Sequence, residues 1–163
     1  MASTEHYEQD FTPPPLPTVI VDVLNSANLC YLATSEDNIP HLSLMNFSVV
    51  DEQDIGCAIV LSTRRDTKKF AAIISNPRVA VLVHDFVGDH GTASVTINGT
   101  MHVTEGEQEE RCRAAHLAKN AKMAQFIVGE QVAILVVTPQ SARICNIQDK
   151  VTYWAPRSLP VEP

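Results

Sequence analysis

A cluster of basic side chains follows an apolar segment near the middle of the chain. Residues 58–62 are mostly apolar, and residues 63–69 (Thr-Arg-Arg-Asp-Thr-Lys-Lys) come directly after them. The pattern that follows indicates a helix, so the cluster would lie where free backbone N–H groups and the positive end of the helix dipole favour anions. Arginine and lysine form charge-assisted hydrogen bonds with phosphate oxygens. The segment therefore predicts a phosphate site.

The same residues also allow a simpler interpretation. Basic side chains at a helix start can form a solvated surface patch, and Asp66 can cap the helix and pair with a neighbouring cation. Hydrolysis of a nucleoside triphosphate is not indicated, because the chain lacks the G-x-x-x-x-G-K-[ST] pattern. Spacing alone leaves the phosphate site and the surface patch both open.

Overall charge makes this cluster stand out. The formal net charge is −7 at pH 7, which argues against a general nucleic-acid binder, because such a protein needs a surplus of lysine and arginine on one face. The first ten residues lack the basic and apolar regions of a signal peptide. No run reaches the roughly eighteen apolar residues of a membrane span. We therefore expect a cytoplasmic protein without nucleic-acid or membrane partners.

Cysteine and histidine spacing does not predict a metal site. The cysteines lie far apart without a C-x-x-C pair, so they are expected to be buried free thiols; they are Cys30, Cys57, Cys112 and Cys145. His84, Asp85, Asp89 and His90 stand among glycines, a context that favours a loop over a metal cluster.

Hydrophobic periodicity places the basic cluster in a mainly β fold with some helix. At 163 residues the chain suits one domain, with a proline-rich extended lead-in at 1–17, the domain at 18–148 and an irregular tail at 149–163. Helices are expected from residue 18, from about 67 to 75 and at 107–118, with a further turn at 123–128. Strands are expected at 29–34, 41–50, 58–62, 79–83, 93–104, 132–137 and 142–147. Six to seven mostly antiparallel strands with peripheral helices favour a small β-barrel.

Three local patterns sharpen these boundaries. Residues 79–83 are apolar at every position, which indicates a strand buried on both faces or lying in a dimer interface. Pro139 separates the last two expected strands. Thr104 and Glu107 have the spacing of a capping box at the start of the 107–118 helix.

The order of several segments resembles the pyridoxamine 5'-phosphate oxidase-like, FMN-binding split-barrel superfamily. The likeness covers about residues 18–148 and depends on the order of the segments 30–34, 39–47, 61–69, 76–83, 99–103 and 136–139. It implies a split barrel and a homodimer with FMN at the subunit interface. It also implies that FMN supplies the redox chemistry, so we expect an FMN-dependent oxidoreductase acting on an unidentified small molecule.

The resemblance also implies which residues border the cofactor. The phosphate would be held by Thr67, Lys68 and Lys69, with Arg64 nearby. Ser94 resembles a position from which the other subunit contacts the flavin. The remaining positions would border the ring and ribityl parts; they are Ser43, Leu44, Met45, Asn46, Ser62 and Thr63.

No catalytic side chain is assigned from the sequence. His41 is expected beside the flavin and could donate a proton, but a lone strand histidine is more often a packed or surface residue. The Arg-x-His segment with which the vitamin B6 oxidase grips its substrate is missing from residues 132–163; Trp154 and Arg157 are the nearest candidates for a contact there. Oxidation of pyridoxamine phosphate is therefore not predicted. The alternative function is non-catalytic binding or carriage of a flavin, deazaflavin or haem.

Overall fold

The computed structural model describes residues 6–7, 16–52 and 56–155. Its helices are α1 (Thr18–Ser26), α2 (Lys68–Ser75), α3 (Gly106–Lys119) and the 3-10 helix η1 (Ala121–Phe126). Its strands are β1 (His6–Tyr7), β2 (Leu29–Glu36), β3 (Ile39–Asn46), β4 (Ser48–Glu52), β5 (Gly56–Arg64), β6 (Arg78–His84), β7 (Ala93–Val103), β8 (Val132–Asn146) and β9 (Val151–Trp154). No helix in these ranges is long and apolar enough to cross a membrane.

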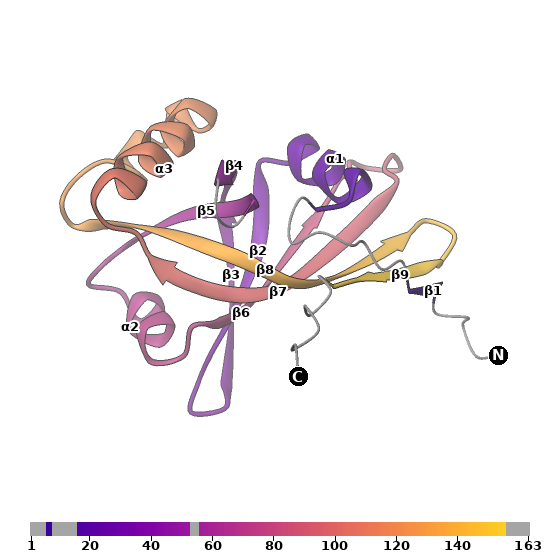
Figure 1. The fold of residues 1–163 in the computed structure, drawn as a ribbon, viewed down its shortest axis with the longest axis horizontal. Helices are drawn as coiled ribbons and strands as arrows, with labels where there is room; N and C mark the ends of the chain where they lie inside the picture. The colour runs from indigo at the N-terminus through magenta and orange to yellow at the C-terminus, as the bar shows by residue number, and fades with distance from the viewer. Residues whose placement is uncertain (1–5, 8–15, 53–55, 156–163) are drawn as a thin grey trace, which may run out of the picture.

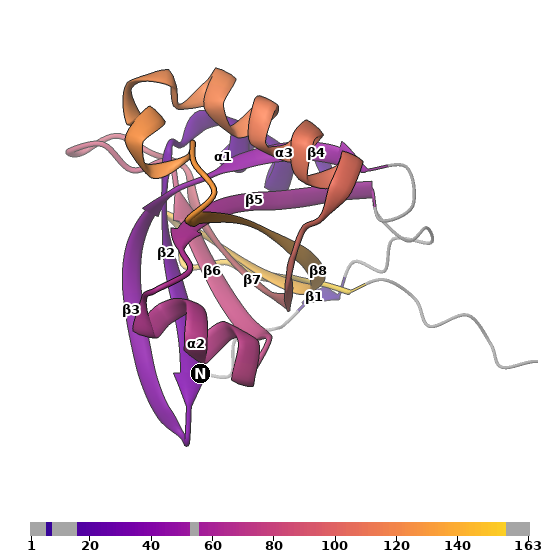
Figure 2. The ribbon, with the colours of Figure 1, turned by 90° about the vertical axis from the view of Figure 1, so that its left-hand side faces the viewer.

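The strands form a strongly curved sheet with helices around it (Figures 1 and 2). Strand order is β1-β9-β8-β7-β6-β2-β3. Strand β5 pairs with β4 and with the first half of β8, along the edge of β8 that does not face β7. Pairing is antiparallel except between β1 and β9. Since β3 passes into β4 through one residue, Phe47, the sheet bends back on itself as a split barrel. The predicted mainly β class with peripheral helices is confirmed.

Among the described residues the sheet has nine strands rather than six or seven, partly because the segment predicted as one strand at 41–50 is two. The break is at Phe47, whose ring is fully buried in the barrel core. Turning the chain there lets Met45 and Phe47 both face the interior while β4 leaves to pair with β5. A sharp bend at a large core side chain does not interrupt the hydrophobic pattern, so the sequence does not reveal it.

At Pro139 the prediction divided one strand into two: the strands predicted at 132–137 and 142–147 are the single strand β8. The register against β7 shifts between Asn98 and Gly99, so that Pro139 pairs with Gly99 and Ser141 with Asn98. Proline, which cannot donate a backbone hydrogen bond, is tolerated at such a bulge. A Cβ on Gly99 would lie 2.3 Å from the carbonyl oxygen of Thr138, so only glycine fits there.

The tail predicted to be irregular contains strand β9. Residues 151–154 pair with residues 142–145 of β8, beyond the part of β8 that pairs with β5. This half of β8 would otherwise present an unpaired edge, and β9 satisfies its backbone groups. Trp154 is 2% exposed and belongs to the barrel core. Arg157 and most of the predicted lead-in lie outside the described residues.

The first half of β8 is buried on both faces. Ala133, Leu135 and Val137 point into the barrel core. Ile134 and Val136 point to the other side, where they form a second apolar cluster with Cys112 of α3. This cluster fixes α3 across β4, β5 and β8 (Figure 2).

The start of α3 differs from the predicted capping box. The hydroxyl of Thr104 donates to the carbonyl of Ile134 at 2.9 Å, and Glu105 occupies the capping position without a side-chain hydrogen bond. Thr104 is fully buried, so its hydroxyl needs a buried acceptor and finds it on β8.

Strand β6 is not buried on both faces within this chain. Its burial alternates, with Val79, Val81 and Val83 in the core and Ala80 and Leu82 half-buried on the other side. We call that other side of β3, β2, β6 and β7 the outer sheet face. It carries apolar side chains that are exposed or half-buried, namely Leu29, Tyr31, Leu42, Leu44 and Leu82.

The burial of the cysteines predicts an order of thiol reactivity. Cys30, Cys57 and Cys112 are buried, and burial raises the pKa of Cys30 to about 12. Cys145, which was also predicted to be buried, is partly exposed at the end of β8. It should be alkylated first, because reactivity depends on the thiolate fraction and on access. Iodoacetamide labelling followed by mass spectrometry checks this. Cys145→Ser should remove the fast phase, and rapid labelling of Cys30 would show that β2 is misplaced.

Candidate functional site

A tight turn joins β5 to α2 at the predicted phosphate segment. The Thr67 hydroxyl donates to the carbonyl of Arg64 at 2.9 Å, and its oxygen accepts from the backbone N–H of Phe70 at 3.2 Å. Thr67 is therefore the cap of α2. The cap satisfies one of the free N–H groups of the first turn and fixes the direction in which the helix starts.

Asp66 pairs with a neighbouring cation, as the surface-patch interpretation allowed, but it is not the helix cap. Its carboxylate pairs with the Arg64 guanidinium, with distances of 2.9 and 2.5 Å. This pairing lowers the pKa of Asp66. Both side chains are exposed to solvent, so the pair adds little stability. Arg64 therefore has its own counter-ion, held in an exposed contact that a ligand can replace.

A pocket of about 390 Å³ opens beside this turn. Its volume falls in the range of small-molecule sites. Strand β3, the end of β5 and the start of α2 contribute most of the residues predicted to border a cofactor, namely Leu44, Met45, Asn46, Ser62, Thr63, Arg64, Thr67 and Lys69. The fold thus brings these positions together, while their binding role stays a prediction.

Three predicted positions do not line this pocket. Lys68 is exposed on the first turn of α2, and Ser43 is on β3 two residues before Met45. Ser94 lies on the outer sheet face, where it pairs in register with His84 and Cys145. Within one chain Ser94 is therefore not part of the pocket.

One wall of the pocket, supplied by α3 and η1, was not predicted from the sequence. His116 lies at the bottom of the pocket, and Met123, Phe126 and Ile127 complete the lining. Met123 and Phe126 remain exposed on the described surface, with 36% and 57% of their surface accessible. Their large apolar side chains just after the charged 107–119 segment were the available signal in the sequence. Only the contacts of η1 with β5 show that they face the pocket.

Lys69 is the cation that enters the pocket. Its ammonium nitrogen is 3.5 Å from the thioether sulfur of Met45. No carboxylate pairs with it in the described part of the chain, and burial lowers its pKa. A partly desolvated ammonium without a counter-ion costs free energy, so the pocket is suited to an anion that would pair with it.

His116 connects the pocket to the protein interior. It is fully buried, and its Nδ1 lies 2.9 Å from the hydroxyl of Ser48, its Nε2 3.3 Å from the hydroxyl of Ser62. Burial, with a smaller contribution from Lys119, lowers the pKa of His116 to about 4. The imidazole is therefore neutral at physiological pH.

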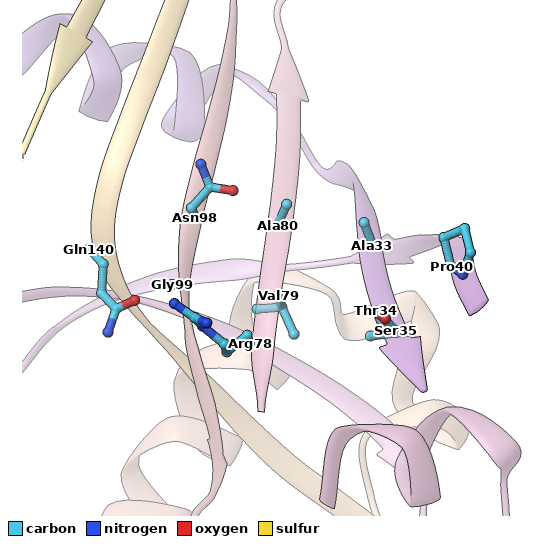
Figure 3. A pocket seen from close by; sticks show the side chains of 10 residues that line it. All are labelled: Ala33, Thr34, Ser35, Pro40, Arg78, Val79, Ala80, Asn98, Gly99 and Gln140. Carbon is cyan, nitrogen blue, oxygen red and sulfur yellow. The ribbon is translucent and has the colours of Figure 1, made fainter. Parts of the chain in front are cut away.

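A second pocket of about 420 Å³ lies on the outer sheet face (Figure 3). Arg78 is its charged lining residue, and Gln140 beside it donates to the hydroxyl of Thr100. It shares no residue with the first pocket and contains no helix start. Although it is slightly larger, the pocket beside α2 is the better candidate because hydroxyls, a cation and a helix start converge there.

The residues between β6 and β7 form a loop whose ends are held by Asp85. The Asp85 carboxylate accepts from the backbone N–H groups of Thr92 and Ala93, which closes the loop. The described residues contain no group of three His, Cys, Asp or Glu side chains that could hold a metal ion.

The curved, mainly antiparallel sheet with peripheral helices places the protein in the split-barrel class. A family model described as pyridoxamine 5'-phosphate oxidase matches residues 16–146. A Schizosaccharomyces pombe protein described as a pyridoxamine 5'-phosphate oxidase homolog is 31% identical over 173 residues, covering 86% of this chain and 91% of that protein. The chain belongs to the pyridoxamine 5'-phosphate oxidase family.

Solved structures show the same fold. A haem-binding protein from Mycobacterium smegmatis superposes with a TM-score of 0.72 at 20% identity, over 82% of this chain; this chain spans only 55% of that longer protein. A FAD-binding protein from Mesorhizobium loti gives a TM-score of 0.65 at 17% identity, over 79% of this chain and 92% of that one.

The pocket fits the phosphate end of a flavin nucleotide. The family implies a flavin, and the observation that tests the fit is the ammonium of Lys69, which is partly buried with only a thioether as its recorded partner. The Thr63 hydroxyl lies 3.4 Å from that of Thr67, whose hydrogen is donated to the carbonyl of Arg64, so Thr63 is the hydroxyl of this pair that can donate to a ligand. An anionic group placed there would accept from Lys69 and from Thr63.

The neutral state of His116 predicts a pH-dependent stability. Its pKa is about 4 in the folded protein, against 6.5 for the unfolded chain, so the unfolded chain binds the proton first as pH falls. Stability from this group is present above pH 6.5 and is lost towards pH 4, by about 2 kcal/mol between pH 7 and pH 5. Urea unfolding at both pH values should show this loss in wild type but not in His116→Gln. Equal losses would contradict the assignment.

Proposed function

We propose that the protein is an FMN-binding flavoprotein, an oxidoreductase of the pyridoxamine 5'-phosphate oxidase class that acts on a small organic molecule. The observation that carries the proposal is the Lys69 ammonium, which enters a pocket of hydroxyl groups at the start of α2 without a carboxylate partner among the described residues. Family membership supports a flavin as the ligand.

The chain's own residues bind and orient the cofactor in this proposal. Lys69 and the hydroxyl of Thr63 hold the phosphate beside the Thr67 cap, while Asn46 and Ser62 hydrogen-bond the remainder. When bound, FMN supplies hydride and electron transfer. The apolar side chains of Met123 and Phe126 line the other side of the pocket, where they exclude water from the reacting face and leave room for an apolar substrate.

Haem is the second ligand to weigh, because one structural neighbour is a haem-binding protein. Haem iron needs an axial side-chain ligand such as histidine. Both ring nitrogens of His116 already contact serine hydroxyls in the interior, and the sulfur of Met45 contacts Lys69. Deazaflavin carriers with acidic tails need a wider basic groove than Lys69 and the paired Arg64 provide. These contacts favour FMN over the non-catalytic haem or deazaflavin alternative.

Lys69→Ala should weaken FMN binding about tenfold or more. A charge-assisted hydrogen bond contributes about 1.5 to 3 kcal/mol, and each 1.4 kcal/mol is tenfold in affinity. Lys68→Ala is the matched control, because Lys68 carries the same charge but is exposed outside the pocket; its loss should stay within about threefold. Quenching of flavin fluorescence measures both.

Riboflavin, which lacks the phosphate, separates phosphate recognition from ring recognition. Its affinity should be the same for wild type and Lys69→Ala. Equal losses for FMN and riboflavin would remove the phosphate assignment. Absorption between 300 and 550 nm, followed by reduction with a nicotinamide donor, then tests whether the bound flavin takes part in turnover.

We also propose that the outer sheet face forms a homodimer interface. It exposes Leu42 and Leu44 at 71% and 59%, next to half-buried Tyr31 and Leu82. Adjacent exposed leucines of this kind mark interaction surfaces. Ser94 lies on the same face, which supports its predicted contact with the partner's flavin. Location in the reducing cytoplasm is part of the proposal, supported by free cysteines throughout the described chain.

Leu42→Glu should convert the dimer to a monomer, because it places a charge in the apolar centre of the interface. Ile74→Glu is the control, since Ile74 is 59% exposed on α2 and outside this face. Light scattering coupled to size-exclusion chromatography reports the mass of each. A monomeric wild type, or dissociation by Ile74→Glu alone, would contradict the interface.

A further inference from the structure

A buried chain of polar side chains leads from the interior to the base of the candidate pocket. It runs from Ser48 on β4 through His116 on α3 to Ser62 on β5, with Asn120 one helical turn after His116. Ser48, His116 and Asn120 are 2%, 0% and 7% exposed. Since buried polar groups need partners, the direction of each hydrogen bond in this series of side chains follows from the others.

Asn120 determines where its amide hydrogens lie. Its nitrogen is 3.3 Å from the carbonyl oxygen of Phe47 and 3.1 Å from that of His116. Carbonyl oxygens only accept hydrogen bonds, so the group facing both of them must be the NH₂ rather than the amide oxygen. These two contacts therefore assign the Nδ2 and Oδ1 positions of Asn120.

The buried hydroxyl of Ser48 in turn determines the tautomer of His116. Its hydrogen needs an acceptor, and its partner is Nδ1 of the imidazole at 2.9 Å. A hydrogen on Nδ1 would remove that acceptor, so Nδ1 carries a lone pair, which is compatible with the Asn120 amide nitrogen 3.3 Å away. A neutral imidazole has one hydrogen, which then lies on Nε2 and is directed at the hydroxyl oxygen of Ser62.

We propose that His116 is a positioning residue that occupies the hydroxyl oxygen of Ser62 with its Nε2–H, so that the Ser62 hydrogen is presented to the ligand. Ser62 lines the pocket, and with its oxygen engaged it acts there as a donor. The pocket therefore selects a ligand with a hydrogen-bond acceptor at this point, such as a ring carbonyl oxygen or a deprotonated ring nitrogen. Taking that ligand to be a flavin rests on the proposed function; the tautomer does not.

The low pKa of His116 keeps this arrangement in place at neutral pH. Protonation would put a second hydrogen on Nδ1, against the Asn120 amide and the donating hydroxyl of Ser48. Lys119, one turn away on α3, adds a repulsive positive charge. The chain of donors thus has one stable direction, from Ser48 to Ser62 and on to the pocket.

The tautomer can be measured without any cofactor. Long-range ¹H–¹⁵N spectra of histidine-labelled protein at pH 7, with His116→Gln used to assign the signal, should show the hydrogen on Nε2. A hydrogen on Nδ1 would overturn the proposal. This measurement stands even if wild type fails to bind FMN, an outcome that would overturn the proposed function alone.

Two amide variants test the positioning role on FMN binding. Glutamine can place an N–H near the position of Nε2, whereas asparagine reaches only that of Nδ1. His116→Gln should bind FMN within about threefold of wild type, and His116→Asn should bind about fivefold to tenfold more weakly, the range of a neutral hydrogen bond. Equal affinities for the two variants would overturn the proposal.

A double-mutant cycle shows whether His116 acts through Ser62. Ser62→Ala should weaken FMN binding as much as His116→Asn does, and the double variant should be no weaker than Ser62→Ala alone. Additive losses would mean that His116 affects the pocket by another route and would overturn the proposal. Ser62→Ala changes no residue of α3, so it still measures the contribution of the Ser62 hydroxyl if the histidine variants lose stability, which urea unfolding would reveal.

Discussion

The arrangement of the site depends on strand β8, which is hydrogen-bonded along both edges and buried on both faces over its first half. Its pairing with β5 runs from Ile59 to Arg64 and so fixes the point at which the chain turns into α2. The backbone N–H of Arg65 continues this contact by donating to the carbonyl of Gln131 at 2.8 Å. On its other face β8 holds α3 through Ile134 and Val136. One strand therefore aligns the phosphate segment on one side of the pocket and His116 on the other.

The sequence predicted the elements that depend on local pattern. The turn from β5 into α2 and its cluster of hydroxyls and cations follow from neighbouring residues, and the pocket forms around them. Prediction failed where distant segments decide the outcome. Phe47 bends a strand because the barrel must close, and Pro139 stays within β8 because Gly99 opposite it allows a bulge. Local periodicity contains neither constraint.

The roles of the site residues also depend on distant segments that the local sequence does not reveal. Lys68 and Lys69 are adjacent and chemically equal, and only the helix phase and the position of β3 direct Lys69 towards Met45 and leave Lys68 in solvent. His116 is separated from Ser48 and Ser62 by more than fifty residues in sequence. In the sequence it is a histidine within a charged helix, and its function becomes apparent only when the second apolar cluster brings α3 onto the barrel.

The two ends of the pocket differ in electrostatic character, and this difference constrains the ligand. At the α2 end, Lys69 provides a charge that is partly desolvated and suits an anion. At the α3 end, the groups are neutral hydrogen-bonding partners, because a charged His116 would be costly at that depth. Met123 and Phe126 add an apolar wall between solvent and these groups. A ligand that satisfies the whole pocket has one anionic end and one uncharged, acceptor-bearing end. A flavin mononucleotide has this division, whereas an inorganic anion fills one end and an uncharged ring the other, so binding of the intact nucleotide should exceed that of either part.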